Sequence, residues 1–336
     1  MGGGARVKVM TPRALLTADC GSGVGLGHLE RMLALADALR ADLEVAVVVP
    51  AGDEALRRRV TDRGHTPIEQ SGDASQRAEA AVAAADSVDV VVLDGYVFDM
   101  ALQRRLRSRA HLTVVDDLCL PADCDLGVNP SPGGELMRPA GADGFLGGAA
   151  FALLRAAFLD ARERVISHGR PARTVLVATG ATDPAGIGAA FTAELLATDA
   201  TVEVVRVVGP DTDVRVDRDQ PRSRRLVAPS TLADALAGAT VYAGAAGTTA
   251  VQAACVGIPS AITAVVPNQV AQAAALADGG CAVVTDAHGL ARACLELLDD
   301  PARCEQMAVR GRALVDGHGA LRVAEAIRTL AADRAA

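Results

Sequence analysis

Short runs of valine, leucine and isoleucine alternate with segments of helical apolar spacing from residue 14 to about residue 128. Strands are expected at 15–18, 44–49, 90–93, 112–115 and 126–128, and helices at 29–39, 54–63, 76–85 and 101–109. Near-continuous apolar strands separated by helices are typical of a parallel sheet that is covered on both faces. The pattern therefore predicts an α/β fold for this half of the chain.

The same alternation restarts after a glycine- and proline-rich stretch at 129–148, which is expected to be a loop. Further strands are expected at 175–178, 202–208, 225–227, 240–243, 260–263 and 282–284. Further helices are expected at 153–164, 185–196, 231–236, 248–256, 269–277, 290–297, 304–314 and 321–332. A chain of 336 residues is long enough for two domains. The predicted organisation is a flexible N-terminus (1–13), an N-terminal domain (14–148), a linker region (149–172), a C-terminal domain (173–320) and a closing helix (321–336), with a cleft between the domains.

A glycine-rich loop follows the first expected strand, where residues 20–31 read CGSGVGLGHLER. Glycine lets a backbone approach a ligand closely, and the N–H groups at the start of a helix favour an anion. His28 lies at this helix start, where an imidazole can accept a proton near neutral pH. The alternative interpretation is an ordinary strand-to-helix turn with a structural histidine. The spacing does not fit G-x-G-x-x-G, which disfavours a nicotinamide or flavin enzyme.

Polar residues follow several of the expected strands. Ligands of parallel sheets bind at the carboxyl ends of the strands, which here selects the loops that begin at Asp19, Asp94, Asp116 and Asn129. Aspartates at these positions also cap helices and fix loops, and for Asp117 this interpretation and a functional one are both kept.

Three loops of the second half have the composition of a phosphate or sugar site. Residues 179–183 (TGATD) and 243–249 (AGAAGTT) each join a strand to a helix, so that backbone N–H groups, with Thr248 and Thr249 in the second loop, can face a diphosphate. Asn268 and Gln269 start a third helix and carry paired donors and acceptors suited to sugar hydroxyls. The alternative for Asp183 and for the two amides is helix or loop capping.

Net charge and cysteine usage limit the classes of partner and the cellular compartment that we expect. The net charge is −8, only 2% of residues are aromatic, and there is no basic block, so nucleic acid is not an expected partner. Seven dispersed cysteines without a C-x-x-C pair read as reduced thiols, and no apolar run is long enough for a membrane span or a signal core. We expect a cytoplasmic protein with no membrane partner, and a homodimer is kept as a candidate assembly.

Several motifs together resemble one enzyme family. In chain order they are G-x-G-H-x-x-R at 25–31, D-x-Y at 94–96, V-D-D-L at 115–118, G-x-x-F-x-L-L-R-x-x-F at 148–158, the loop 180–183, the glycine-rich loop 244–249, G-x-P at 257–259 and the pair at 268–269. Their order resembles the PseG/SpsG group of nucleotide-sugar enzymes, relatives of the MurG-type GT-B glycosyltransferases. The resemblance covers roughly residues 14–285.

The resemblance implies a GT-B fold, in which two Rossmann-like domains face each other and the C-terminal one holds a UDP-sugar without a metal or another cofactor. It assigns His28 as the catalytic histidine and Asn268 as a residue near the reacting sugar. The substrate-binding candidates are Gly25, Gly27, Arg31, Asp94, Tyr96, Asp116 and Gln269. The nucleotide-binding candidates are Gly180, Thr182, Asp183, Ala228, Leu232, Gly247, Thr248, Thr249 and Gln252.

Two positions depart from the family pattern. The hydrolase branch usually reads D-H-Y where this chain has Gly95, and Gln252 stands where a glutamate commonly holds the ribose hydroxyls. A glutamine still hydrogen-bonds a ribose, but without the strength of a charged carboxylate. The first departure argues against assigning the hydrolase's sugar chemistry to this chain. The second leaves the identity of the nucleotide open.

The preferred hypothesis is a metal-independent glycosyltransferase with His28 as general base, moving a sugar from a nucleotide-diphosphate donor, expected to be a UDP-sugar, to a small acceptor such as a nucleobase or a natural-product aglycone. One alternative is a UDP-sugar hydrolase in which His28 activates water. Another is a non-catalytic nucleotide-sugar binding protein, against which the retained His28 and Asn268 argue.

A metal-dependent GT-A transferase is the remaining chemical rival. Its D-x-D pattern occurs at 123/125, 211/213 and 217/219. The last two pairs lie in a polar stretch that reads as a solvated loop, and the first lacks the flanking architecture of a metal site.

Overall fold

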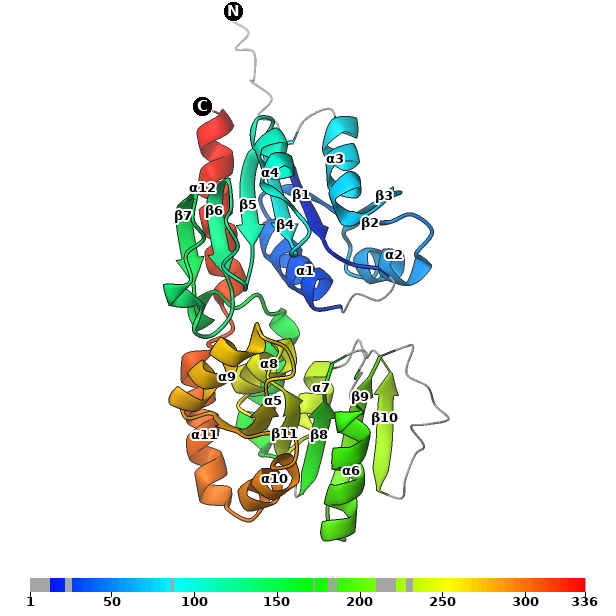
Figure 1. The fold of residues 1–336 in the computed structure, drawn as a ribbon, viewed down its shortest axis with the longest axis vertical. Helices are drawn as coiled ribbons and strands as arrows, with labels where there is room; N and C mark the ends of the chain where they lie inside the picture. The colour runs from blue at the N-terminus through cyan, green and yellow to red at the C-terminus, as the bar shows by residue number, and fades with distance from the viewer. Residues whose placement is uncertain are drawn as a thin grey trace, which may run out of the picture.

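The computed structural model describes residues 13–21, 26–85, 88–171, 173–180, 183, 186–209, 222–227 and 232–335. Two parallel β-sheets, each flanked by helices, lie one above the other along the long axis of the molecule (Figure 1). The α/β alternation predicted from the sequence is therefore confirmed in both halves.

The first sheet has seven strands in the order β3-β2-β1-β4-β5-β6-β7, and every neighbouring pair is parallel. Its strands are β1 (Arg13–Ala18), β2 (Glu44–Pro50), β3 (Thr66–Gln70), β4 (Val90–Asp94), β5 (His111–Val115), β6 (Cys124–Asn129) and β7 (Ala142–Gly147). Its helices are α1 (Gly27–Leu39), α2 (Glu54–Thr61), α3 (Ala74–Ala84) and α4 (Met100–Arg107). The central strand β4 is buried at every position, as a sheet covered on both faces requires.

The second sheet has six parallel strands in the order β10-β9-β8-β11-β12-β13. Its strands are β8 (Thr174–Ala178), β9 (Glu203–Val208), β10 (Ser223–Val227), β11 (Val241–Ala245), β12 (Ser260–Thr263) and β13 (Ala282–Val284). Its helices are α5 (Ala156–His168), α6 (Ile187–Thr198), α7 (Leu232–Ala237), α8 (Thr248–Val256), α9 (Gln269–Asp278), α10 (Leu290–Leu298) and α11 (Pro301–Leu314).

Two strands were not predicted, and both lie at an edge of the first sheet. β3 reads TPIEQ and none of its residues is fully buried. β7 lies inside the stretch 129–148, so the prediction of a continuous loop there is wrong; short 3₁₀ turns also occur at Gly134–Leu136 and Ala149–Phe151. An edge strand pairs on one side only and needs no long apolar run, which is why its sequence resembles a loop.

The expected linker region 149–172 contains α5, whose apolar face packs into the core of the second sheet through Phe158, Ala161 and Val165. The C-terminal end of the chain then returns to the first sheet. The last helix, α12 (Gly319–Ala335), lies beside the first sheet and packs against α1, with Val323 and Ile327 fully buried (Figure 1). The C-terminal helix therefore supports the helix that carries His28.

In the middle of each sheet the chain starts to add strands on the opposite side. The strand order reverses between β1 and β4 in the first sheet and between β8 and β11 in the second. Such switch points leave a crevice at the carboxyl ends of the strands, where ligands of open α/β sheets bind.

Candidate active site

A cavity of about 340 Å³ lies between the carboxyl ends of the two sheets. The first sheet contributes the start of α1 and the loops after β4, β5 and β6, and the second contributes the loops after β8, β11 and β12. We call this the first cavity; it contains His28 and Asn268. A second cavity of about 180 Å³ shares Gly27, Gly180, Thr248 and other walls with the first. Both switch points therefore open onto one continuous site.

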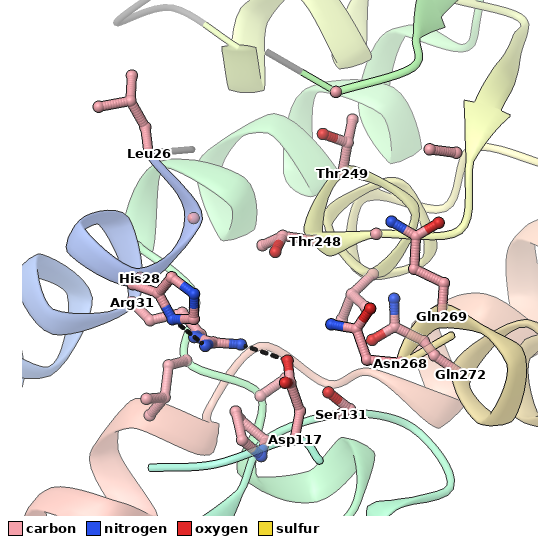
Figure 2. Close-up of a pocket in the computed structure, with 18 of the residues that line it drawn as sticks. Leu26, His28, Arg31, Asp117, Ser131, Thr248, Thr249, Asn268, Gln269 and Gln272 are labelled. Carbon is pink, nitrogen blue, oxygen red and sulfur yellow. Dashed lines mark hydrogen bonds and ion pairs between the residues drawn. The ribbon is translucent and has the colours of Figure 1, made fainter. Parts of the chain in front are cut away.

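His28 and Arg31 lie on the same face of α1, because residues three apart on a helix are neighbours. Arg31 is buried and makes a double contact with Asp94 at the end of β4, from Nε to Oδ2 at 2.9 Å and from Nη2 to Oδ1 at 2.7 Å. Its Nη1 donates to Asp117 Oδ2 at 2.9 Å. Figure 2 shows the two side chains pointing together toward Asp117. The G-x-G-H-x-x-R spacing thus builds one charged cluster.

The ionisation of this cluster follows from its burial and its pairing. Burial opposes the charge of Arg31, but Asp94 and Asp117 outweigh it and raise the pKa of the guanidinium. Burial likewise opposes the charge of Asp117, yet the charge of Arg31 and the hydrogen bond from Tyr96 hold the pKa of this carboxyl below its usual range. Arg31 and Asp117 therefore remain a charged pair at neutral pH.

The Nδ1 atom of His28 has two close neighbours, Asp94 Oδ1 at 2.7 Å and Arg31 Nη2 at 2.8 Å. It can donate to Asp94 or accept from Arg31, but not both, so the tautomer decides the chemistry. With the proton on Nδ1, the ring donates to Asp94 and its Nε2 lone pair is available to the first cavity, which the ring lines.

Tyr96 joins the two halves of the molecule. Its hydroxyl donates to Asp117 Oδ1, and it accepts from Asn268 Nδ2 at 3.0 Å. Its ring meets the His28 ring edge-on, with centroids 5.1 Å apart. Burial and the negative charge of Asp117 raise the pKa of Tyr96, so the phenol stays protonated at neutral pH. The D-x-Y, V-D-D-L and N-Q motifs converge at this contact.

The wall opposite His28 is the start of α8. Gly247 precedes the helix in an extended conformation, and no side chain caps the helix start. Thr248 and Thr249 line both cavities, so hydroxyls and first-turn N–H groups are directed toward the site. Strand β11, which leads into this loop, needs glycine at position 244. There φ is +151°, and a Cβ atom would lie 2.0 Å from the Ala178 carbonyl oxygen.

The second cavity carries both charge and an unsatisfied acceptor. Gln252 is buried, and its Oε1 has no hydrogen-bond partner in the described part of the chain. Arg155 and Glu30 lie on the same cavity wall, with 3.8 Å between Arg155 Nη1 and Glu30 Oε2. Glu30 is already paired with Arg59 Nη1 at 2.8 Å and Arg63 Nη2 at 2.6 Å. Burial, together with the charge of Arg63, lowers the pKa of Arg155, and the charge of Glu30 opposes this effect.

Most of the residues predicted for the site are brought together. Those that line one or both cavities are Gly27, His28, Arg31, Tyr96, Gly180, Leu232, Gly247, Thr248, Thr249, Gln252, Asn268 and Gln269. Asp94 lies behind His28, fully buried. The candidates Gly25, Thr182 and Ala228 lie outside the described residues.

Two predicted residues have a different position. Asp116 accepts from the backbone N–H groups of Leu118 at 2.9 Å and Leu120 at 2.6 Å, which fixes its own loop. Asp183 accepts from the N–H groups of Ile187 and Gly188 and caps α6. Neither lines a cavity, so their side chains serve loop and helix geometry, as the capping alternative anticipated for Asp183.

Arg155 was not among the predicted site residues, and for Asp117 the functional and the capping interpretation were both kept. Both belong to motifs that the sequence showed, V-D-D-L and L-L-R, but nothing in the spacing says which of two adjacent carboxylates faces a cleft. Glu30, Arg59, Pro130 and Ser131 also line the cavities, and no sequence signal marked them.

A metal site was not expected, and the D-x-D residues have other partners. Among the described residues, no three histidine, cysteine, aspartate or glutamate side chains gather into a metal-binding group. Asp123 and Asp125 both pair with Arg107, at 2.8 and 3.0 Å, at the start of β6 rather than in the cleft. The pairs at 211/213 and 217/219 lie outside the described residues.

No protein-family model matches the chain, and no curated protein sequence matches it significantly. Solved structures match nearly all of it. The glycotransferase of kitacinnamycin is 18% identical with a TM-score of 0.69, over 95% of this chain and 99% of that one. MurG of Acinetobacter baumannii is 17% identical with a TM-score of 0.60, over 95% and 100%. The spinosyn rhamnosyltransferase SpnG is 18% identical with a TM-score of 0.63, over 95% and 99%.

The chain has the GT-B fold. The architecture of two Rossmann-like halves around a cleft, expected from the resemblance, is confirmed, and the GT-A alternative is wrong for the fold. SpnG has also been solved with thymidine diphosphate and with the spinosyn aglycone. No described helix of this chain combines the length and hydropathy that crossing a bilayer requires.

Proposed function

We propose that this GT-B protein is a metal-independent glycosyltransferase that moves a sugar from a nucleotide-diphosphate sugar to a small acceptor, such as a natural-product aglycone or a nucleobase. The observation that carries the proposal is the meeting of two helix starts across the cleft. A Cβ atom on Gly27 would lie 3.6 Å from Thr248 Oγ1, so the helix with His28 directly faces the start of α8. A base and an anion-binding helix end therefore face the same small volume.

His28 is proposed as the general base. With its Nδ1–H donating to Asp94, Nε2 accepts the acceptor's proton while the acceptor's nucleophilic atom bonds to the anomeric carbon. The bond from that carbon to the diphosphate breaks, and its electron pair stays on the diphosphate. Asp94 stabilises the imidazolium that forms, and the start of α8 stabilises the departing anion.

The second cavity is proposed to hold the nucleoside. The unpartnered Oε1 of Gln252 is an acceptor that a ribose hydroxyl or base N–H group would satisfy. Arg155 adds positive charge beside Thr248 and Thr249, where a diphosphate would lie. We keep a UDP-sugar as the proposed donor. Because SpnG binds thymidine diphosphate, dTDP belongs in the first screen.

A UDP-sugar hydrolase remains the competing function, because the His28–Asp94 pair would activate water by the same geometry. A non-catalytic binding protein is the third candidate. The two catalytic candidates differ in product, and the third differs from both in having no turnover that depends on His28.

The first experiment is a melting-temperature screen with UDP, CMP, GDP, dTDP and UDP-sugars. A ligand at a hundred times its Kd stabilises the fold by about 2.7 kcal/mol, which a melting curve resolves. The donor that binds is then incubated with an acceptor panel, and products are identified by mass spectrometry for the wild type and for His28→Ala.

A glycosylated product that disappears in His28→Ala supports the transferase. Free sugar and UDP with every acceptor would establish the hydrolase instead, and turnover that survives His28→Ala would remove the histidine from the mechanism. No shift with any nucleotide would overturn the nucleotide-sugar site itself.

A further inference from the structure

Exposed apolar side chains gather on three short segments beside the first cavity. Of the thirteen large apolar side chains that are exposed in the described part of the chain, seven lie within 96–97, 118–120 and 265–270. One of the seven is Tyr96, which also lines the first cavity. We call the other six the acceptor rim: Val97, Leu118, Leu120, Val265, Val266 and Val270. Single exposed apolar residues are ordinary, but a concentration of them at one site indicates a binding surface.

The three segments meet at the hydroxyl of Tyr96. This hydroxyl contacts Asp117, next to Leu118, and Asn268, between Val266 and Val270. All three of these polar residues line the first cavity. The acceptor rim is therefore continuous in the chain with the residues that surround His28, and none of its members lines the second cavity.

Hydrogen bonds with polar side chains fix the backbone of the rim. Asp116 accepts from the N–H groups of both Leu118 and Leu120. The Gln269 side chain accepts from the N–H of Val265 at 3.0 Å. Ser75 Oγ donates to the Val97 carbonyl at 3.0 Å. Loops fixed in this way present their apolar side chains with little freedom to withdraw, which lowers the entropic cost of binding.

The charges of the first cavity do not suit an anionic acceptor. The arginine among its lining residues, Arg31, is committed to Asp94 and Asp117 through three hydrogen bonds. Any acceptor near Tyr96 also meets the ionised Asp117. A carboxylate or phosphate on the acceptor would therefore be repelled rather than paired.

We propose that the acceptor is an uncharged, mostly apolar molecule that packs over the acceptor rim and presents a single nucleophilic group to His28. This deepens the proposed glycosyltransferase function and rests on it. It favours an aglycone of fused or large rings over a nucleobase, whose edge is polar throughout. It also gives Asp116 a positioning role, because Asp116 holds two rim residues without touching the cavity.

The test compares a rim variant with a matched control. The rim variant carries Leu118→Ser and Val270→Ser, one change on each side of the cleft. The control carries Ile166→Ser and Val309→Ser, two exposed apolar residues on α5 and α11 that lie outside the rim. None of the four residues lines either cavity, so the melting shift with UDP serves as a check on folding and on the donor site.

Acceptors are offered in neutral and acidic pairs, such as 4-methylumbelliferone and 7-hydroxycoumarin-4-acetic acid, with the donor found in the nucleotide screen. The wild type is expected to prefer the neutral member. The rim variant is expected to raise the KM for neutral acceptors roughly tenfold with little change in kcat, and the control is expected to match the wild type. Binding of the neutral dye Nile red to the UDP-saturated protein gives a readout that needs no turnover, and its affinity should fall in the rim variant alone.

Equal Nile red affinity in the rim variant and the wild type would overturn the proposal, as would a preference for the acidic acceptors. Rim-dependent binding to phosphatidylcholine vesicles without an effect on soluble acceptors would assign the rim to a membrane surface and also overturn it. If no nucleotide shifts the melting temperature of the wild type, the proposed function fails instead, and Nile red binding to the wild type and the rim variant without nucleotide decides whether the rim is a binding surface.

Discussion

In the proposed mechanism the residue on which the chemistry depends is Asp94, because it accepts from the Nδ1–H tautomer of His28 and pairs with Arg31 at once. Asp94→Asn is expected to lower kcat by about 10²–10⁴, since the amide can donate to Nδ1 and place the proton on Nε2. It also leaves the buried Arg31 with one charged partner fewer, which is expected to cost about 3–5 kcal/mol of stability. Steady-state kinetics and chemical denaturation measure the two effects separately.

Asp116→Asn is the matched control, because Asp116 is a buried carboxylate that does not touch His28. It is expected to raise the KM for the acceptor through the rim while leaving kcat near the wild-type value. A kcat for Asp94→Asn within tenfold of the wild type would show that the tautomer argument is wrong.

Gly95, where this chain departs from the D-H-Y pattern, has a backbone conformation that favours glycine. Its φ is +148°, a conformation that other residues rarely adopt, and a Cβ atom there would lie 2.6 Å from Asp19 Cβ. Gly95→His is therefore expected to lower the free energy of unfolding by about 1–3 kcal/mol or more and to create no hydrolase activity. Gly27→Ala, where the new methyl group meets only an ordinary contact at 3.6 Å, is the stability control. An undiminished melting temperature in Gly95→His would show that this backbone tolerates a side chain.

At the scale of single elements, the start of α8 and Arg155 are expected to share the charge of a diphosphate. Arg155→Gln should weaken UDP binding about tenfold, the loss expected for one charge-assisted hydrogen bond, and should leave uridine binding unchanged. Calorimetric titration with uridine, UMP and UDP measures the dependence on phosphate. Arg164→Gln, on the same segment but paired with Asp234 outside both cavities, is the control. An equal loss for uridine and UDP would mean that Arg155 only supports the fold.

The elements also show how far sequence reasoning reaches. Strands buried on both faces, such as β4, require a continuous apolar run and were predicted. β3 and β7 lie at an edge, so nothing in TPIEQ or ADGFLG had to be apolar throughout. His28 and Arg31 were readable because helix spacing alone places them together. Which of Asp116 and Asp117 enters the cleft depends on the path of the loop after β5, and the position of Arg155 depends on a crossing between sheets, so neither follows from local pattern.

For the molecule as a whole, its two tyrosines report on its two halves. The chain has two tyrosines, so a phenolate signal comes from Tyr96 and Tyr242 alone. Because the chain has no tryptophan, no indole absorbance overlaps this signal. Tyr96 bridges the cleft, whereas Tyr242 is fully buried in the second sheet, with its hydroxyl 2.9 Å from the Ala178 carbonyl oxygen and 2.8 Å from that of Ala245. Burial raises the pKa of both phenols, and the charge of Asp117 raises that of Tyr96 further.

The sign of the effect follows from linkage. A raised pKa means that the native state holds these protons above the usual tyrosine pKa of about 10, while the unfolded state releases them. The stabilisation is complete below pH 10 and is lost as the pH rises above it. Phenolate absorbance should therefore appear together with the loss of far-UV circular dichroism, not before it. If the halves unfold separately, two steps are expected, and Tyr96→Phe should remove the one that reports on the cleft. Titration of Tyr242 near pH 10 in a protein that keeps its native circular dichroism would contradict its burial. The same result for Tyr96 would contradict the closed contact between Tyr96, Asp117 and Asn268 on which the acceptor rim depends.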